Sequence, residues 1–451
     1  MTETTGPMAN GSTRLTVMSA DSHVGPRLEE DLRQYCPKQH LEEFDRFSAA
    51  NAKTMDEGDE PGDLSGRSTQ ASEVSKVRRF VNRRTPGHYD VATRLREMDW
   101  EGVAAEVIFH GSQNTEVYPF GGRREWSEPD TKKDLELVAV GHRMYNRWLA
   151  DFCSVAPERL IGLAYVPMWD VDLAVEELAW AAGRGLKGVN FPAPREGIAE
   201  YDHPQWEPFW SACEDLDMNL STHIGLPGND VFGPQAMAMS RLDDGWPCRR
   251  GMVRMIFGGV FARHPGLKLV LTELQRGWWR WTMRELDFVY SSPSEALRAQ
   301  VPEAPSEYMT SNVFIGASFM PPSAVHEAIE EDYVDQVIWG RDYPHGEGTY
   351  KYPETASEES QTKHYLRWAF QGVPAEVAVK MLSATGIYAY NLDRTALERV
   401  ASRIGPTLDE LVQPLERVPA EWANNLVDVH TGEVAEGFVP IMARGGVATP
   451  S

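Results

Sequence analysis

Polar side chains that could bind a metal ion follow four short apolar stretches of the sequence. Asp21 and His23 come directly after the first of these stretches, and His223 ends another. Alternate side chains of an extended chain point to the same side, so Asp21 and His23 would lie together. Asp342 and Glu273 follow two further stretches. Imidazole nitrogens and carboxylate oxygens suit Zn²⁺, Mn²⁺ or Fe²⁺, so this pattern predicts a divalent metal site.

A metal ion at such a site would hold a water molecule and lower its pKa toward neutrality. Asp342 would complete the site and take a proton from that water, and Glu273 or His345 would protonate the leaving group. His345 lies three residues beyond Asp342, after a proline. It could instead donate a hydrogen bond to the substrate or to Asp342, or be a surface histidine in a lid.

Each of these residues taken alone has a structural explanation. Asp-Ser-His sequences such as that at Asp21 often stabilise turns, and Asp342 could cap the next helical turn. A single histidine at the end of a strand, such as His223, is commonly a hydrogen-bonded core residue. Because all three positions follow apolar stretches, a common site explains them better than coincidence does.

Five further residues are candidates for binding a substrate. Arg276 and Arg341 could bind a carboxylate with both arms of the guanidinium group, although ion pairs with nearby acids would also explain them. Asn190 and His110 end two more apolar stretches and would line the mouth of the site. Trp278, in the segment RGWWRW, could form a wall for a flat aromatic substrate or pack against the fold. The sequence leaves these alternatives open.

Eight apolar stretches are expected to be the strands that position these residues. Helix-like segments alternate with them, as at Val171–Arg184 and Pro204–Asp217, where apolar residues recur near every 3.6 positions. This alternation predicts parallel βαβ units, and eight of them suggest a closed (β/α)8 TIM barrel with its chemistry at the carboxyl ends of the strands. A doubly wound open sheet is the alternative, although no GxGxxG motif follows any strand. The expected strands are Leu15–Ala20, Ala105–Phe109, Leu160–Val166, Lys187–Phe191, Asn219–Thr222, Leu267–Thr272, Val313–Ala317 and Val337–Gly340.

The chain is expected to divide into a flexible N-terminus (1–14), the barrel (15–393) and a C-terminal extension or arm (394–451). Within the barrel, residues 53–79 are polar and rich in Gly, Ser and Asp, which is typical of a surface insertion. The C-terminal extension could be an arm of an oligomer or a cover over the barrel, with a possible hairpin at 427–439.

Two long segments, 111–130 and 226–251, follow the second and fifth strands. They would be lids over the site or ordinary long loops.

Composition restricts the possible partners and location. Asp and Glu number 67 against 44 Lys and Arg, so the formal charge is −23. Such a charge argues against binding nucleic acid or an anionic membrane. We find no run of apolar residues long enough to cross a membrane and no secretory signal. The four cysteines are scattered without CxxC spacing, which favours reduced thiols in a cytoplasmic protein.

Together these segments resemble the amidohydrolase superfamily, in particular the amidohydrolase-related branch. That branch contains the aminocarboxymuconate semialdehyde, γ-resorcylate and 5-carboxyvanillate decarboxylases besides metal-dependent hydrolases. The resemblance implies a distorted TIM barrel, a homodimer, and one divalent ion, Zn²⁺ or Mn²⁺, bound by Asp21, His23, His223 and Asp342. It extends over residues 16–393 and rests on SADSHV (19–24), GLKGVNFP (185–192), STHIG (221–225), RHPGLKLVLTE (263–273), WGRDYPH (339–345) and SATGIYAYNLD (383–393).

The sequence departs from the decarboxylases of this branch at one position. They usually carry a proton-transferring histidine after the HPxLK segment, whereas Glu273 stands here. Glu273 could be a general acid or base, a partner of a ligand, or an extra ligand. This departure favours a metal-dependent hydrolase acting on an amide, lactam or lactone of a small cyclic or aromatic acid. A non-oxidative decarboxylase of an aromatic or unsaturated carboxylic acid is the alternative. A non-catalytic barrel that acts as a binding protein is the third, and the filled ligand positions speak against it.

Overall fold

The computed structural model describes most of the chain, and all statements below concern these residues. They are 13–56, 86–111, 117–121, 132–193, 197–224, 245–274, 277–318, 320–345, 348–349, 359–423, 426 and 433–436.

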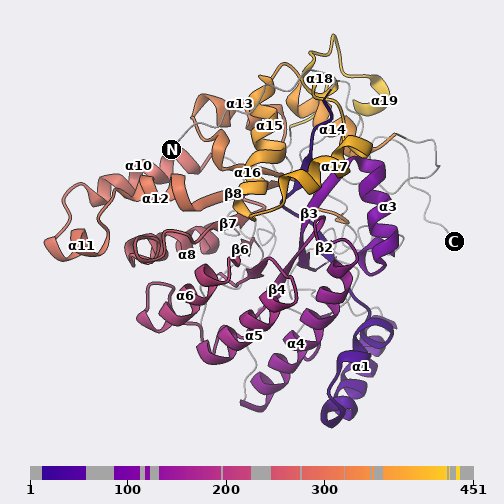
Figure 1. Ribbon diagram of the computed structural model, residues 1–451, viewed down its shortest axis with the longest axis vertical. Coiled ribbons are helices and arrows are strands. Elements are labelled where there is room, and N and C mark those ends of the chain that lie inside the picture. Colours follow the sequence, from indigo (N-terminus) through magenta and orange to yellow (C-terminus); the bar gives the residue numbers. More distant parts are fainter. Residues whose placement is uncertain are drawn as a thin grey trace, which may run out of the picture.

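Nine parallel strands form a single sheet at the centre of the molecule, surrounded by helices (Figure 1). Neighbours along the sheet follow the order β1-β3-β4-β5-β6-β7-β8-β9, and β2 pairs with the end of β3. All eight stretches expected to be strands form strands, and the first of them continues into a second short strand. The strands are β1 (Val17–Ser19), β2 (His23–Val24), β3 (Val103–His110), β4 (Leu160–Tyr165), β5 (Gly188–Asn190), β6 (Asn219–His223), β7 (Leu269–Thr272), β8 (Val313–Ser318) and β9 (Val337–Gly340).

The first and last strands meet, so the sheet closes into a nearly complete barrel. The backbone N–H of Ala20 donates to the carbonyl of Trp339 at 2.7 Å, and that of Asp342 donates to Asp21 at 3.0 Å. A parallel bridge between Ser22 and Tyr343 extends this contact past the end of β9. The expected (β/α)8 barrel is therefore confirmed, and the open sheet is wrong.

Helices follow most strands and cover the outside of the barrel (Figure 1). The expected helix at Val171–Arg184 is α5, which begins after Asp170, whose carboxylate accepts from the N–H of Leu173. The helices are α1 (Leu41–Asp56), α3 (Val91–Glu101), α4 (Lys132–Ser154), α5 (Val171–Gly183), α6 (Glu207–Asp215), α8 (Gly245–Phe257), α9 (Val260–Arg263), α10 (Trp279–Tyr290), α11 (Glu295–Gln300), α12 (Pro305–Asn312), α13 (Pro322–Glu330), α14 (Gln361–Phe370), α15 (Ala375–Val379), α16 (Thr385–Ala389), α17 (Arg394–Ile404), α18 (Leu408–Val412) and α19 (Ala420–Ala423).

Alternate residues of the strands fill the interior of the barrel. Phe109, Leu163 and Ile338 belong to one buried apolar cluster inside it. Because side chains alternate along a strand, the next inward positions toward the carboxyl ends face the mouth. At β9 the next position after Gly340 is Asp342, which carries a candidate ligand to the mouth.

Residues after the last strand close the opposite end of the barrel. Ile387, Tyr390 and Leu397 pack into the interior cluster. The side chain of Asn219 donates to the carbonyl of Ala389 at 3.0 Å, which ties this segment to the beginning of β6. The mouth at the carboxyl ends is therefore the end of the barrel that this segment leaves uncovered.

Several expected segments lie wholly or largely outside the described residues. These are 57–79 of the polar insertion, most of 111–130, residues 226–244, and most of the possible hairpin at 427–439. The division at residues 14 and 393 and the homodimer stay predictions. Among the helices that the structure describes, none is both long and apolar enough to cross a membrane.

Candidate metal centre

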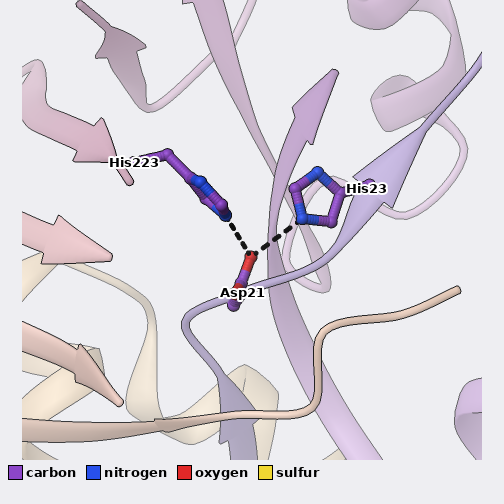
Figure 2. Close-up of side chains that lie close together, drawn as sticks. All are labelled: Asp21, His23 and His223. Atoms are coloured by element: carbon purple, nitrogen blue, oxygen red, sulfur yellow. Dashed lines mark ion pairs between the residues drawn. The ribbon is translucent and has the colours of Figure 1, made fainter. Parts of the chain in front are cut away.

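Three candidate ligands meet at the mouth of the barrel (Figure 2). Asp21 lies between the two histidines, with its Oδ1 atom 3.3 Å from His23 Nε2 and 3.5 Å from His223 Nε2. Asp21 and His23 are fully or almost fully buried, and only a tenth of the His223 side chain is exposed. Asp21 lies between β1 and β2, His23 begins β2, and His223 ends β6.

Asp342 and His345 reach the same place from the chain that follows β9. Asp342 Oδ1 lies 3.1 Å from His23 Nε2 and 2.8 Å from His345 Nδ1. The potential ligand atoms thus form two groups of three that share His23, one with Asp21 and His223 and one with Asp342 and His345.

The backbone fixes the tautomers of all three histidines. His23 Nδ1 donates to the carbonyl of His110 at 3.0 Å, and His223 Nδ1 donates to that of Ile224 at 2.5 Å. A carbonyl only accepts hydrogen bonds, so Nδ1 carries the proton and the neutral ring directs its Nε2 lone pair at the carboxylates. The nitrogen lone pairs repel the carboxylate oxygens that they face, so a cation is required between them. Either a metal ion or a proton can be that cation. His345 has the opposite arrangement, because its Nε2 donates to the carbonyl of Gly111 at 2.7 Å.

Burial and mutual attraction shift the pKa values of these groups. Burial alone would raise the pKa of Asp21, but His223 and His23 hold it well below its ordinary value. Burial alone would lower the pKa of His23, but Asp21 and Asp342 raise it well above its ordinary value. The pKa of His223, lowered by burial and raised by Asp21 and Glu273, is about 9. The metal-free centre therefore attracts positive charge strongly.

Hydrogen bonding also indicates a cation site. The described residues give no hydrogen-bond partner to the buried atoms Asp21 Oδ1, His23 Nε2, His223 Nε2 and both carboxylate oxygens of Asp342. The other Asp21 oxygen does accept one, from Ser318 Oγ at 2.5 Å. Buried polar atoms are nearly always paired, so five unpaired atoms of four neighbouring side chains fit a metal ion as their partner.

Glu273 stands beside the ligand nitrogen of His223, with its Oε2 atom 3.3 Å from Nε2. Both Glu273 and Asp342 have left-handed backbones, with φ of 61° and 54°. This conformation is uncommon for residues with a Cβ atom, although Asp adopts it more readily than most. Both carboxylates therefore reach the mouth by a strained turn just past a strand.

Two candidate substrate residues point away from the mouth. Arg341 is fully buried and pairs with Glu101 and Glu106, which is the ion-pair alternative that the sequence left open. The ring of His110 packs against Tyr118 and Tyr145, with centroids 5.0 and 5.2 Å away. Its backbone carbonyl, and not its ring, contacts His23.

The other three candidate substrate residues have different positions. Asn190 is buried at the end of β5, and its side-chain amide donates to the hydroxyl of Tyr165. Trp278 is buried and packs against Trp279, with ring centroids 5.3 Å apart. Arg276 lies outside the described residues.

Sequence reasoning did not find two residues that line this centre. Ser318 ends β8 and holds Asp21, and Phe109 packs its ring against His223 at 5.1 Å. Each stands at an inward position at the carboxyl end of a strand. Position along the strand was therefore the available signal, because the residue types themselves are common in strands.

Comparison with known proteins identifies the family. Residues 131–384, more than half of the chain, match the Amidohydrolase family. γ-Resorcylate decarboxylase from Rhizobium sp. is 26% identical over 276 residues, which cover 56% of this chain and 76% of that protein. 2-Amino-3-carboxymuconate-6-semialdehyde decarboxylase from Dictyostelium discoideum is 25% identical over 267 residues, which cover 57% and 67%.

A solved structure shares the fold. It is 5-carboxyvanillate decarboxylase from Novosphingobium aromaticivorans with bound manganese and 3-methoxy-4-hydroxy-5-nitrobenzoic acid. The TM-score is 0.55 at 17% identity, covering 85% of this chain and 99% of that one. All three of these proteins are decarboxylases. The comparisons therefore favour the decarboxylase alternative and leave the hydrolase interpretation without support. The chain belongs to the amidohydrolase family and is an enzyme of that family.

Proposed function

We propose that the protein is a metal-dependent, non-oxidative decarboxylase of an aromatic carboxylic acid. The observation that carries this proposal is the pair of fixed tautomers, which directs two imidazole lone pairs at the carboxylates of Asp21 and Asp342. The decarboxylase activity of the relatives supports the choice of reaction.

Asp21, His23, His223 and Asp342 would hold one divalent ion, Mn²⁺ or Zn²⁺. The manganese bound in the structurally similar 5-carboxyvanillate decarboxylase supports Mn²⁺. When bound, the ion supplies positive charge that attracts the substrate carboxylate and an oxygen on the neighbouring ring carbon. Glu273 Oε2 lies 3.3 Å from His223 Nε2, which supports Glu273 as a partner of that ligand.

The pair formed by Asp342 and His345 would deliver the proton that the reaction requires. Loss of CO₂ leaves its bonding electrons on the ring carbon, and a proton must form the new C–H bond there. His345 Nε2 donates to the carbonyl of Gly111, so its Nδ1 lone pair faces Asp342 Oδ1 at 2.8 Å and would take up the proton that passes between the two groups. Burial alone would raise the pKa of Asp342, but His345 and His23 hold it below its ordinary value, so the ionised carboxylate would relay the proton and would not store it.

Stacking argues against His345 as a metal ligand. Its ring lies 4.0 Å from that of His23, with 14° between the planes. A nitrogen lone pair lies in the plane of its ring, so two nearly parallel rings at this separation direct their lone pairs past one another. If His23 binds the ion, His345 is left to act on Asp342.

The experiment is a product analysis of the Mn²⁺-loaded protein with hydroxylated aromatic acids, beginning with γ-resorcylate and 5-carboxyvanillate, the acids named for its relatives. We expect release of CO₂ and, in D₂O, one deuterium at the carbon that lost the carboxylate. Asp342→Asn is the matched control and should release little CO₂. Hydrolysis of lactones or amides with oxygen incorporated from labelled water, and no CO₂ from any acid, would contradict the proposal.

A further inference from the structure

A buried group of charged and aromatic side chains lies where the first and last strands meet. We call it the seam cluster. Its members come from α3, from β3 and from the chain just after β9, and none is more than 9% exposed. They are Arg94, Glu97, Glu101, Glu106, Arg341 and Tyr343.

Ion pairs join the three parts of the seam cluster. One oxygen of Glu106 accepts from Arg94 Nε, and the other accepts from Arg341 Nη2 at 2.6 Å and Nε at 3.1 Å. Arg341 also pairs with Glu101. Both arginines therefore have carboxylate partners, as fully buried charges require.

Tyr343 lies at the centre of the seam cluster. The guanidinium of Arg94 covers its ring at 3.9 Å and that of Arg341 covers it at 4.5 Å. The Tyr343 hydroxyl donates to Glu97. The two guanidinium groups fix the plane of the Tyr343 ring, and the hydrogen bond to Glu97 fixes the position of its hydroxyl group.

Two backbone contacts connect the seam cluster to the metal centre. The carbonyl of Tyr343, the residue after Asp342, accepts from the N–H of His23 at 2.5 Å. Arg94 Nη1 donates to the carbonyl of His23 at 2.8 Å. Both polar groups of the His23 backbone are thus held by members of the cluster. A shift of Arg94 or Tyr343 would change the separation of His23 and Asp342.

We propose that Arg94 and Tyr343 are positioning residues that set the spacing of His23 and Asp342 and thereby the metal affinity of the centre. This inference rests on the metal site of the proposed function. It does not depend on which reaction the site performs. Hydrogen bonds to the backbone of His23 fix the position of its Cα atom and therefore the position of its ring.

The test compares Arg94→Lys with a matched control. Lysine keeps a charge for Glu106 but lacks the planar fork that also covers Tyr343 and reaches the His23 carbonyl. We expect Mn²⁺ binding, measured by electron paramagnetic resonance, to weaken about 10- to 100-fold, with shifted visible bands of the Co²⁺-loaded protein. The control Arg147→Lys alters another arginine that pairs with a glutamate, Glu177, and covers an aromatic ring, that of Trp180 at 3.7 Å. It should leave both signals unchanged.

Tyr343→Phe is a milder second variant, which removes only the hydroxyl that contacts Glu97. We expect it to fold and to weaken Mn²⁺ binding several-fold, and it decides the matter alone if Arg94→Lys does not fold. Wild-type affinity and an unshifted Co²⁺ spectrum in the folded variants would overturn the inference. A wild-type protein that binds Mn²⁺ but releases no CO₂ would contradict the proposed reaction and leave this comparison valid.

Discussion

His345 lies stacked on His23, with ring centroids 4.0 Å apart, and presents Nδ1 to Asp342 Oδ1 at 2.8 Å. Both histidines contact the carboxylate of Asp342, and we assign each of them a different role. His23 directs its Nε2 lone pair toward the metal position, whereas His345 would exchange a proton with Asp342. The two tasks can be separated by mutation.

His345→Asn is expected to lower kcat by about 100-fold or more while the protein keeps its metal, because a proton donor is lost and no ligand is. Steady-state kinetics and metal analysis of the purified variant measure the two effects. His364→Asn is the control, since His364 pairs with Glu359 and stacks on Trp422. Loss of the ion in His345→Asn would instead make His345 a ligand.

His223→Ala and Asp342→Asn should affect the centre differently. His223 contributes a neutral nitrogen donor, so its removal should leave far less than one ion per chain. Asp342→Asn keeps an oxygen atom near His23 but removes the acid, so turnover should collapse more than metal content does. Metal analysis beside CO₂ release tests both, and appreciable activity in either variant would contradict the assigned roles.

Gly340→Ala should weaken metal binding by crowding Asp21. A Cβ atom at residue 340 would lie 2.8 Å from Ser318 Oγ and 2.9 Å from the Asp21 Cβ atom. The Mn²⁺ dissociation constant is expected to rise about 10-fold or more, because the hydrogen bond that orients a ligand is displaced. Gly183→Ala, where the added Cβ meets nothing within 4 Å, is the matched control. Equal Mn²⁺ affinity in the two variants would contradict the claim that a Cβ atom at residue 340 disturbs Asp21 as a ligand.

Metal affinity should fall as the pH falls. In the metal-free protein His223 has a pKa of about 9, against an ordinary value of 6.5, and the pKa of His23 is also raised. Below pH 9 the ion must therefore displace a proton from His223. For each displaced proton, the apparent affinity for the ion falls about tenfold per unit decrease in pH. Mn²⁺ titrations between pH 6.5 and 9 measure the slope. An affinity that does not change over this range would contradict the assigned ligands.

His88 should make the fold sensitive to acid. Burial, together with the nearby Arg94, lowers the pKa of His88 to about 3 from an ordinary 6.5. The unfolded chain therefore binds a proton below pH 6.5 that the folded chain refuses, so stability is complete above pH 6.5 and is lost as the pH falls toward 3. The free energy of unfolding should fall between pH 7 and pH 5 by about 2 kcal/mol more in the wild type than in His88→Gln. Urea unfolding at both pH values measures this difference, and equal losses would refute it.

Much of the fold could be predicted because its strands are continuous apolar stretches. β3 is buried along its whole length, as expected for a parallel strand between helices and a filled barrel. The first stretch was harder, since the chain bends at Asp21, where Ser19 Oγ donates to the Asp21 carbonyl at 2.7 Å and a second strand begins. Such side-chain contacts with the backbone leave little trace in the hydrophobic pattern.

The ligands could be predicted from residue type and position, whereas several substrate candidates could not. Adjacent residues in a strand point to opposite faces, so Asp342 in the mouth places Arg341 outside it, and Phe109 inside places His110 outside. This alternation was available in the sequence. The seam cluster was not, because its partners come from α3, β3 and the chain after β9.

Anomalous diffraction at the manganese edge, from crystals grown with Mn²⁺, would locate the ion itself. We expect one peak at the mouth of the barrel, about 2 Å from Asp21 Oδ1, His23 Nε2, His223 Nε2 and an oxygen of Asp342. A mouth without a peak, or a peak bound by other side chains, would contradict it.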